Sequence, residues 1–220
     1  MATATRSPYP APPPAPGSPG RRPARVRFTV DDYHRLAELG FLHEDARVEL
    51  VEGDLIAMSP IGPRHADVVD RLVELLVPLL LRRAIVRVQN PLRLDEHSEP
   101  EPDLMLVNCR EGRYASAHPR PDDVLLLIEV MDSSADYDRG TKLGLYARFA
   151  VTEVWLIDLT EQRIELHRSP NEGTYTERLI RSRGQTVAPT RFPDVELDVD
   201  AILGPGATAA GPGPLPPPRA

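Results

Sequence analysis

The 220-residue chain has one cysteine, one lysine and one tryptophan, and none of its apolar runs approaches the ~20 residues that a membrane-spanning helix needs. A single cysteine, Cys109, excludes both a disulfide framework and a site of several thiolate ligands. Without a spanning segment, we expect a cytoplasmic protein that has no membrane partner. Of the 26 lysine and arginine residues, all but Lys142 are arginine, and the ammonium group of Lys142 has a pKa that its surroundings can shift.

Proline is concentrated at the two ends of the chain. Eight of the 25 prolines fall in residues 1–24, and six fall in residues 204–220. Neither end has the aliphatic periodicity of a helix or a strand, so both are predicted to be disordered tails. The intervening residues, 25–203, are enough for one ordinary domain with its own core.

Acidic residues outnumber basic ones, and the formal charge is −7. The two tails contain four arginines and no acidic residue, so residues 25–203 carry about −11. Such a domain lacks the basic balance with which general nucleic-acid binders neutralise phosphates. Its charge is compatible instead with a site of carboxylates that hold a divalent metal ion.

Capping and turn signals divide this domain into helices and strands. Thr29 and Asp32 form a capping box before a helical pattern, the pair Glu52-Gly53 is typical of a β-hairpin turn, and Pro78 is expected to kink or shorten the second helix. The predicted elements are helices over 30–39, 65–83 and 136–149, strands over 47–51, 54–58, 103–107, 124–130, 153–158, 163–167 and 175–180, one or two strands within 84–94, and a short closing element over 198–203. This order predicts an α/β fold with a mixed central sheet flanked by helices.

Two carboxylates stand where the predicted strands are apolar. Glu129 interrupts the apolar run 124–130, and a buried carboxylate is costly unless it is paired, hydrogen-bonded or metal-bound. Asp103 stands at the start of its strand, after Pro102, which fixes an extended entry. If the two strands are neighbours, the carboxylates converge where oxygen ligands suit Mg²⁺ or Mn²⁺. The plainer alternatives are a strand-end glutamate that reaches solvent or an arginine, and an acidic strand start.

Seven sequence blocks in a fixed order carry a resemblance to a known family. They are VELVEGDLI at 48–56, MSP at 58–60 with His65, QNP at 89–91, SEPEPD at 98–103, LIEV at 127–130 with Ser133, DRGTK at 138–142 with Tyr146, and EVWLID at 153–158. Over about residues 27–203, the chain resembles the Uma-type putative restriction endonuclease family, a branch of the PD-(D/E)XK nuclease superfamily. The resemblance implies a restriction-endonuclease-like fold, in which a mixed central β-sheet is flanked by helices.

The family pattern also implies roles for particular acids. Asp103 and Glu129 match the paired catalytic acids, and Glu49 matches an earlier acid contributed from outside the paired strands. The resemblance implies that these three carboxylates and the main-chain carbonyl of Val130 hold one or two Mg²⁺ or Mn²⁺ ions.

The departure from the superfamily pattern concerns the lysine. The superfamily places it two residues beyond the second acid, where this chain has Met131. In this family the basic residue is displaced to the following helix, and Lys142 matches it, which implies a catalytic role. The alternative is that Asp138 and Lys142 form an i, i+4 pair on a helix surface, worth only ~0.2–0.5 kcal/mol.

Three further residues match family positions and are expected to be supporting polar groups: His65, Gln89 and Tyr146. For His65, a cap or a contact behind the metal ligands is the plainer expectation, and a metal ligand or proton donor is the sharper one. Trp155 is expected in the core, and Glu52 in the hairpin turn.

The resemblance and the acids together predict a Mg²⁺- or Mn²⁺-dependent endonuclease that hydrolyses phosphodiester bonds in DNA. A homodimer is a family-level expectation, because cutting both strands suits two-fold symmetry. One alternative is a catalytically silent nuclease-fold protein that binds or assembles, since a fold does not determine its function. A metal-dependent phosphatase or nucleotide hydrolase is a third possibility, which no glycine-rich phosphate loop supports.

Overall fold

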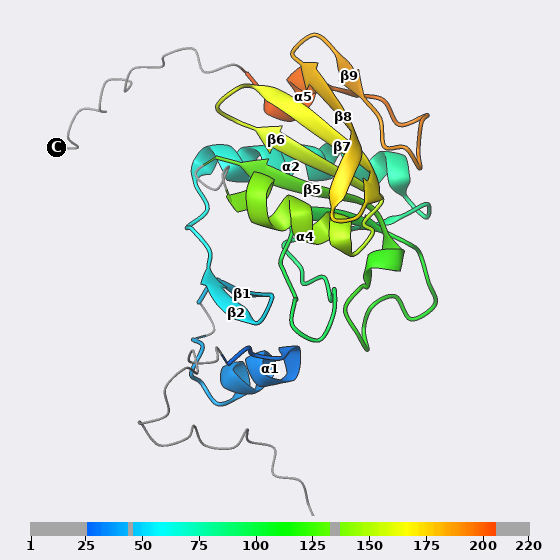
Figure 1. Ribbon diagram of the computed structural model, residues 1–220. Helices are drawn as coiled ribbons and strands as arrows, with labels where there is room; N and C mark the ends of the chain where they lie inside the picture. The colour runs from blue at the N-terminus through cyan, green and yellow to red at the C-terminus, as the bar shows by residue number, and fades with distance from the viewer. Residues whose placement is uncertain (1–25, 44–45, 133–136, 206–220) are drawn as a thin grey trace, which may run out of the picture.

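A six-stranded mixed sheet forms the centre of the molecule (Figure 1). The computed structural model describes residues 26–43, 46–132 and 137–205, so the predicted tail 1–24 and nearly all of the tail 204–220 lie outside the described residues. The strands are β3 (Ile85–Val88), β4 (Leu104–Val107), β5 (Val124–Met131), β6 (Glu153–Asp158), β7 (Arg163–Asn171) and β8 (Thr174–Ser182). They lie in this order across the sheet, and every neighbouring pair is antiparallel except β5 and β6.

Helices cover both faces of the sheet, with α2 (Pro63–Leu80) on one face and α4 (Leu143–Arg148) on the other (Figure 1). Leu72 of α2 packs in a first core with Trp155 of β6, as predicted for this tryptophan. Tyr146 of α4 belongs to a second core on the opposite face. Because both faces of the central strands are covered, all of β6 and nearly all of β5 are buried.

The N-terminal elements lie beyond one end of the sheet (Figure 1). Helix α1 (Val30–Glu38) begins with the predicted capping box, in which Thr29 and Asp32 each accept a main-chain hydrogen bond from the other residue. The predicted hairpin forms as β1 (Val48–Val51) and β2 (Asp54–Ala57), which pair with each other in a separate two-stranded sheet.

The hairpin turn has the backbone that its sequence predicts. Glu52 and Gly53 have φ values of 50° and 82°, and two positive φ angles give a turn whose twist matches that of the strands. The main chain of Glu99 donates to the carbonyl of Leu50 at 2.8 Å, and Gly53 donates to the carbonyl of His97 at 2.7 Å. These bonds tie the hairpin to the segment that leads into β4, and they bring Glu49 towards the sheet.

Several boundaries differ from the prediction. Helix α2 ends at Leu80 rather than at Arg83, because Leu81 adopts an extended backbone shortly after Pro78. Within 84–94 only β3 is a strand, since Gln89 has a φ of 47° and turns the chain away. Strands β7 and β8 both extend beyond their predicted ends.

Short elements complete the fold. The 3-10 helix η1 (Pro121–Asp123) precedes β5, and β9 (Thr186–Val187) pairs with β10 (Leu197–Asp198). The predicted closing element forms as β10 and α5 (Val199–Leu203), whose apolar side chains join the first core with those of α2. Among residues 26–43, 46–132 and 137–205, no helix is long and apolar enough to cross a membrane.

Candidate active site

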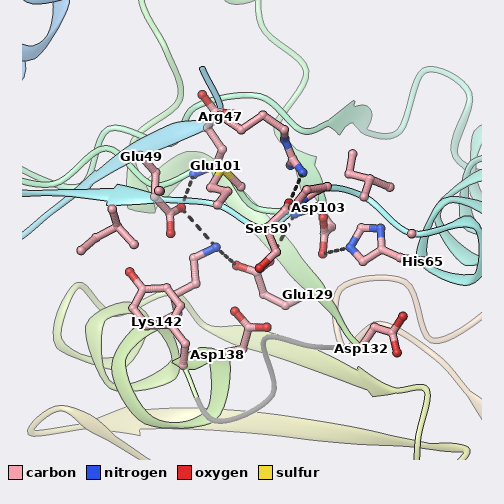
Figure 2. Close-up of a pocket in the computed structure, with 17 residues that line it drawn as sticks. Arg47, Glu49, Ser59, His65, Glu101, Asp103, Glu129, Asp132, Asp138 and Lys142 are labelled. Carbon is pink, nitrogen blue, oxygen red and sulfur yellow. Dashed lines mark hydrogen bonds and ion pairs between the residues drawn. The ribbon is translucent and has the colours of Figure 1, made fainter. Parts of the chain in front are cut away.

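Asp103 and Glu129 lie beside each other at one end of the sheet (Figure 2). Strands β4 and β5 are neighbours, as the predicted convergence of the two acids requires. The main chain of Asp103 donates to Glu129 Oε2 at 3.3 Å, and the main chain of Val130 donates to Asp103 Oδ2 at 2.8 Å. The two residues are 7% and 2% exposed, so the alternative of a glutamate that reaches solvent is wrong.

Lys142 contacts the carboxylate of Glu129 from the side opposite Asp103 (Figure 2). It ends η2 (Asp138–Lys142), a π-helical turn that leads directly into α4; residues 133–136 of the predicted helix lie outside the described residues. Lys142 Nζ is 3.0 Å from Glu129 Oε1 and 3.2 Å from Glu49 Oε2.

The alternative of a surface i, i+4 pair is therefore wrong. Asp138 and Lys142 are each only 4% exposed, and the π turn changes the α-helical spacing on which that pair depends. Met131, which stands where the superfamily has its lysine, is fully buried in the second core. The basic group beside Glu129 thus comes from η2 instead of β5.

Two further contacts fix the orientation of the acids around Lys142. The Tyr146 hydroxyl donates to Glu129 Oε1 at 2.6 Å, so this oxygen has two partners while Oε2 faces Asp103. Glu49, at 1% exposed, accepts a main-chain hydrogen bond from Glu101 at 3.1 Å through the oxygen that also faces Lys142. Carboxylates held in this way lose little freedom when a ligand binds.

His65 contacts the other acid of the pair. It is the third residue of α2, and its Nε2 lies 3.0 Å from Asp103 Oδ2. It does not cap the helix, whose N-cap position is Gly62. Its Nδ1 atom is buried and has no hydrogen-bond partner among the described residues. His65 is thus placed to hold the Asp103 side chain in position.

The charges of the site are coupled. Burial raises the pKa of Glu129 to about 8; Lys142 opposes this shift, and the negative charges of Asp138 and Asp103 add to it. Burial alone would lower the pKa of Lys142, but Glu129, Glu49 and Asp138 outweigh that effect and raise it. Lys142 therefore keeps its positive charge. Three carboxyl groups, those of Glu129, Glu49 and Asp138, surround this single positive charge.

Gln89 and Val130, the remaining predicted site residues, face the acid pair through main-chain groups. Gln89 donates a main-chain hydrogen bond to the carbonyl of Asp103 at 3.0 Å, and its side chain is not among those that line the pocket. Leu159 donates to the carbonyl of Met131 at 3.0 Å, so that carbonyl faces β6. Because main-chain groups alternate in direction along a strand, the carbonyl of Val130 faces the side of Asp103.

The acids line a cavity of about 490 Å³, and its lining also includes residues that were not predicted to belong to the site. Arg47 stands two residues before Glu49, and Glu101 stands two residues before Asp103. This spacing places side chains on the same face of an extended segment, and it is the signal that could have identified both. No comparable sequence signal marks Asp138 as a pocket residue, because its burial depends on the π turn.

The donor set fits one kind of metal ion. Within the described part of the chain, no cluster of three or more His, Cys, Asp or Glu side chains is arranged to hold a metal. The donors at the acid pair are the Asp103 and Glu129 carboxylates and the Val130 carbonyl. Glu49, the third carboxylate predicted to hold the metal, lines the same pocket and faces Lys142 Nζ at 3.2 Å, and its role as a ligand stays a prediction. One or two carboxylates, completed by water and phosphate oxygens, are the usual ligands of Mg²⁺ in phosphate chemistry. The residues therefore fit a hydrated Mg²⁺ or Mn²⁺ ion and do not fit a metal enclosed by side chains.

The fold and this end of the sheet define a restriction-endonuclease-like protein. Residues 30–200 match the model of the Uma2 family, described as "Putative restriction endonuclease", and the chain belongs to this family. A crystal structure described as "a putative nuclease belonging to DUF820", from Anabaena variabilis ATCC 29413, is similar with a TM-score of 0.63 and 17% identity, over 80% of this chain and 97% of that one. At this identity the likeness concerns the fold, and it confirms the predicted fold class. No curated protein matches the chain.

Proposed function

We propose that this protein is an endonuclease that hydrolyses DNA phosphodiester bonds with Mg²⁺ or Mn²⁺. The observation that carries the proposal is the 3.0 Å contact between Lys142 Nζ and Glu129 Oε1, next to Asp103. It supplies from η2 the basic group that Met131 does not supply from β5. Two acids and a lysine, the side chains that the PD-(D/E)XK pattern requires, therefore meet in one pocket.

Each residue has a role that follows from its contacts. Asp103, Glu129 and the Val130 carbonyl would hold the metal ion, which when bound would polarise the scissile phosphate and lower the pKa of a bound water. Lys142 stays charged and donates hydrogen bonds, so it orients the attacking water or offsets the negative charge that develops on the phosphate. Tyr146 acts as a positioning residue through its hydrogen bond to Glu129.

The acidic balance of the domain does not conflict with a DNA substrate. A divalent cation is often the largest local charge in a site, and it reverses the field that an approaching phosphate meets. The carboxylates that repel DNA in the metal-free protein are then the groups that bring positive charge to the pocket.

Cleavage of supercoiled plasmid tests the proposal. We expect nicked and linear products with Mg²⁺ or Mn²⁺ and none with EDTA, and we expect Asp103→Asn and Glu129→Gln to lose the activity. Asp194→Asn is a matched control, because Asp194 is an exposed acid that pairs with Arg83 outside the pocket. Light scattering on the same preparation tests the expected homodimer.

Two results would contradict the proposal. If the wild-type protein binds plasmid but leaves it intact with either metal, the catalytically silent alternative holds. If Glu129→Gln cleaves at the wild-type rate, the activity does not come from this pocket.

A further inference from the structure

A cluster of arginines lies outside the catalytic pocket, on β3 and the neighbouring loops. Residues 108–120 contain three arginines and one acidic residue, in a chain whose formal charge is −7. The side chains of these three arginines are exposed. With one arginine of β3 and one that follows it, they form what we call the arginine patch: Arg87, Arg93, Arg110, Arg113 and Arg120.

The patch is organised around a buried aromatic ring. Tyr114 is 8% exposed and packs in the second core. The guanidinium carbon of Arg110 is 3.8 Å from its ring centroid, and that of Arg87 is 5.5 Å away. Burial lowers the pKa of Arg87, and the positive charges of Arg113 and Arg110 contribute to this shift. Like charges are thus held close together on one rigid support.

Carboxylates compensate this charge only weakly. Asp123 lies 3.9 Å from Arg110, and Asp31 lies 3.9 Å from Arg93, which is the outer limit of an ion pair. Exposed pairs of this kind contribute little, because solvent screens them. The Nε atom of Arg87 is buried and has no hydrogen-bond partner among the described residues. Arginines with such weak ion pairs suit an anion that several guanidinium groups bind together.

A hollow next to the patch is also lined by basic side chains. It has a volume of about 400 Å³, and Arg93, Arg120, His34 and His118 are among its lining residues. Glu99 is the one acid of that lining; it is 1% exposed, and one of its oxygens lies 2.6 Å from His34 Nε2. The hollow therefore presents mainly hydrogen-bond donors to a ligand.

One residue of the patch, Arg87, lies across the sheet from the strand that begins after Asp103. Arg87 on β3 pairs with Met105 on β4, two residues beyond Asp103. Met105 packs in the second core, on the side of the sheet that Tyr146 and α4 cover. Arg87 thus lies on the strand next to β4, which begins directly after Asp103, and Glu129 lies one strand further on, in β5.

We propose that the arginine patch binds the DNA phosphate backbone that flanks the cleaved bond, an inference that rests on the proposed function. DNA carries one negative charge per ≈1.7 Å of helix axis, so a duplex that reaches Asp103 has further phosphates beyond the pocket. The patch would then supply the backbone contacts that the net charge of the domain does not.

The salt dependence of binding tests this inference. A fluorescent DNA duplex is titrated at several NaCl concentrations, with Ca²⁺ in place of Mg²⁺. The variant Arg110→Gln/Arg113→Gln/Arg120→Gln should reduce the slope of log K against log [NaCl] by about 2 to 3, because each lost phosphate contact removes about 0.9. The corresponding triple lysine variant keeps the charges and should keep most of the slope.

A matched control removes the same charge elsewhere. Arg71, Arg83 and Arg183 each pair with one exposed aspartate, and Arg71 lies on α2, on the opposite face of the sheet. Their triple glutamine variant should leave the slope unchanged. An equal loss in both triple variants would mean that only net charge matters, and an unchanged slope in the patch variant would likewise overturn the inference.

Two further measurements keep the test decisive. If the patch triple variant does not fold by circular dichroism, Arg113→Gln and Arg120→Gln are measured singly, and each should lower the slope by about 1. Plasmid cleavage separates the two proposals. A patch-dependent slope without cleavage supports the patch and contradicts the nuclease, whereas metal-dependent cleavage with an unchanged slope does the reverse.

Discussion

Replacing Lys142 by methionine tests the electrostatics of the site. Methionine keeps a side chain of similar length and removes the charge, so Glu129 and Glu49 lose a cation at 3.0 Å and 3.2 Å while they remain 2% and 1% exposed. Breaking a buried ion pair from one side costs about 3–5 kcal/mol, because the remaining charge is left without compensation. We expect a loss of this size where both carboxylates are ionised.

The loss should depend on pH, with a definite sign. Burial already raises the pKa of Glu129 from 4.5 to about 8, and losing Lys142 raises it further. A carboxyl group with a raised folded-state pKa stabilises the protein below its unfolded pKa, and this contribution is lost as the pH rises through the folded pKa. The variant should therefore be penalised little near pH 5 and most above about pH 9.

Urea unfolding of the metal-free protein at the two pH values measures this penalty. Arg71→Met removes an exposed charge from an i, i+4 pair and should show no such pH dependence. Adding Glu129→Gln to Lys142→Met should restore much of the stability at high pH, because no unpaired charge is then left at that position. A penalty below about 1 kcal/mol at high pH, or one that is equal at both pH values, would show that Lys142 does not compensate the charge of Glu129.

Three further outcomes are expected. Lys142→Arg should retain metal binding and lose cleavage activity by ~10²-fold or more, because the planar guanidinium is wider and spreads the charge that the compact ammonium group concentrates; wild-type rates would contradict a catalytic lysine. Mn²⁺ should raise the melting temperature of the wild-type protein by mass action, and Asp103→Asn should abolish that rise; an unchanged rise would remove Asp103 from the site. Tyr146→Phe should cost about 1–3 kcal/mol in urea unfolding, because Glu129 Oε1 loses a buried donor; a neutral substitution would show that this hydrogen bond is unimportant.

Local signals were sufficient for much of the fold. The capping box at Thr29 and the turn at Glu52 specify their backbone within a few residues, so α1 and the hairpin form as predicted. Boundaries that depend on tertiary contacts are harder to predict from local sequence. The end of β3 is set by the unusual backbone of Gln89, and the full length of β7 and β8 comes from their pairing with each other.

Part of the candidate site also follows from local sequence, and part of it does not. The apolar run around Glu129 indicates a buried acid from sequence alone, and neighbouring strands then place Asp103 beside it. The environment of Lys142 does not follow from its local sequence, because α-helical spacing suggests a surface pair with Asp138. A π turn buries both residues, and the family resemblance was the only guide to Lys142 as part of the site.

A crystal structure with Mn²⁺ and a short DNA duplex would locate the metal independently of activity, because Mn²⁺ scatters anomalously. We expect Mn²⁺ bound by the Asp103 and Glu129 carboxylates and the Val130 carbonyl, with a phosphodiester next to it and within reach of Lys142. A structure that shows DNA but no Mn²⁺ in this pocket, with Lys142 still bridging Glu49 and Glu129, would contradict a metal-dependent nuclease site at Asp103 and Glu129.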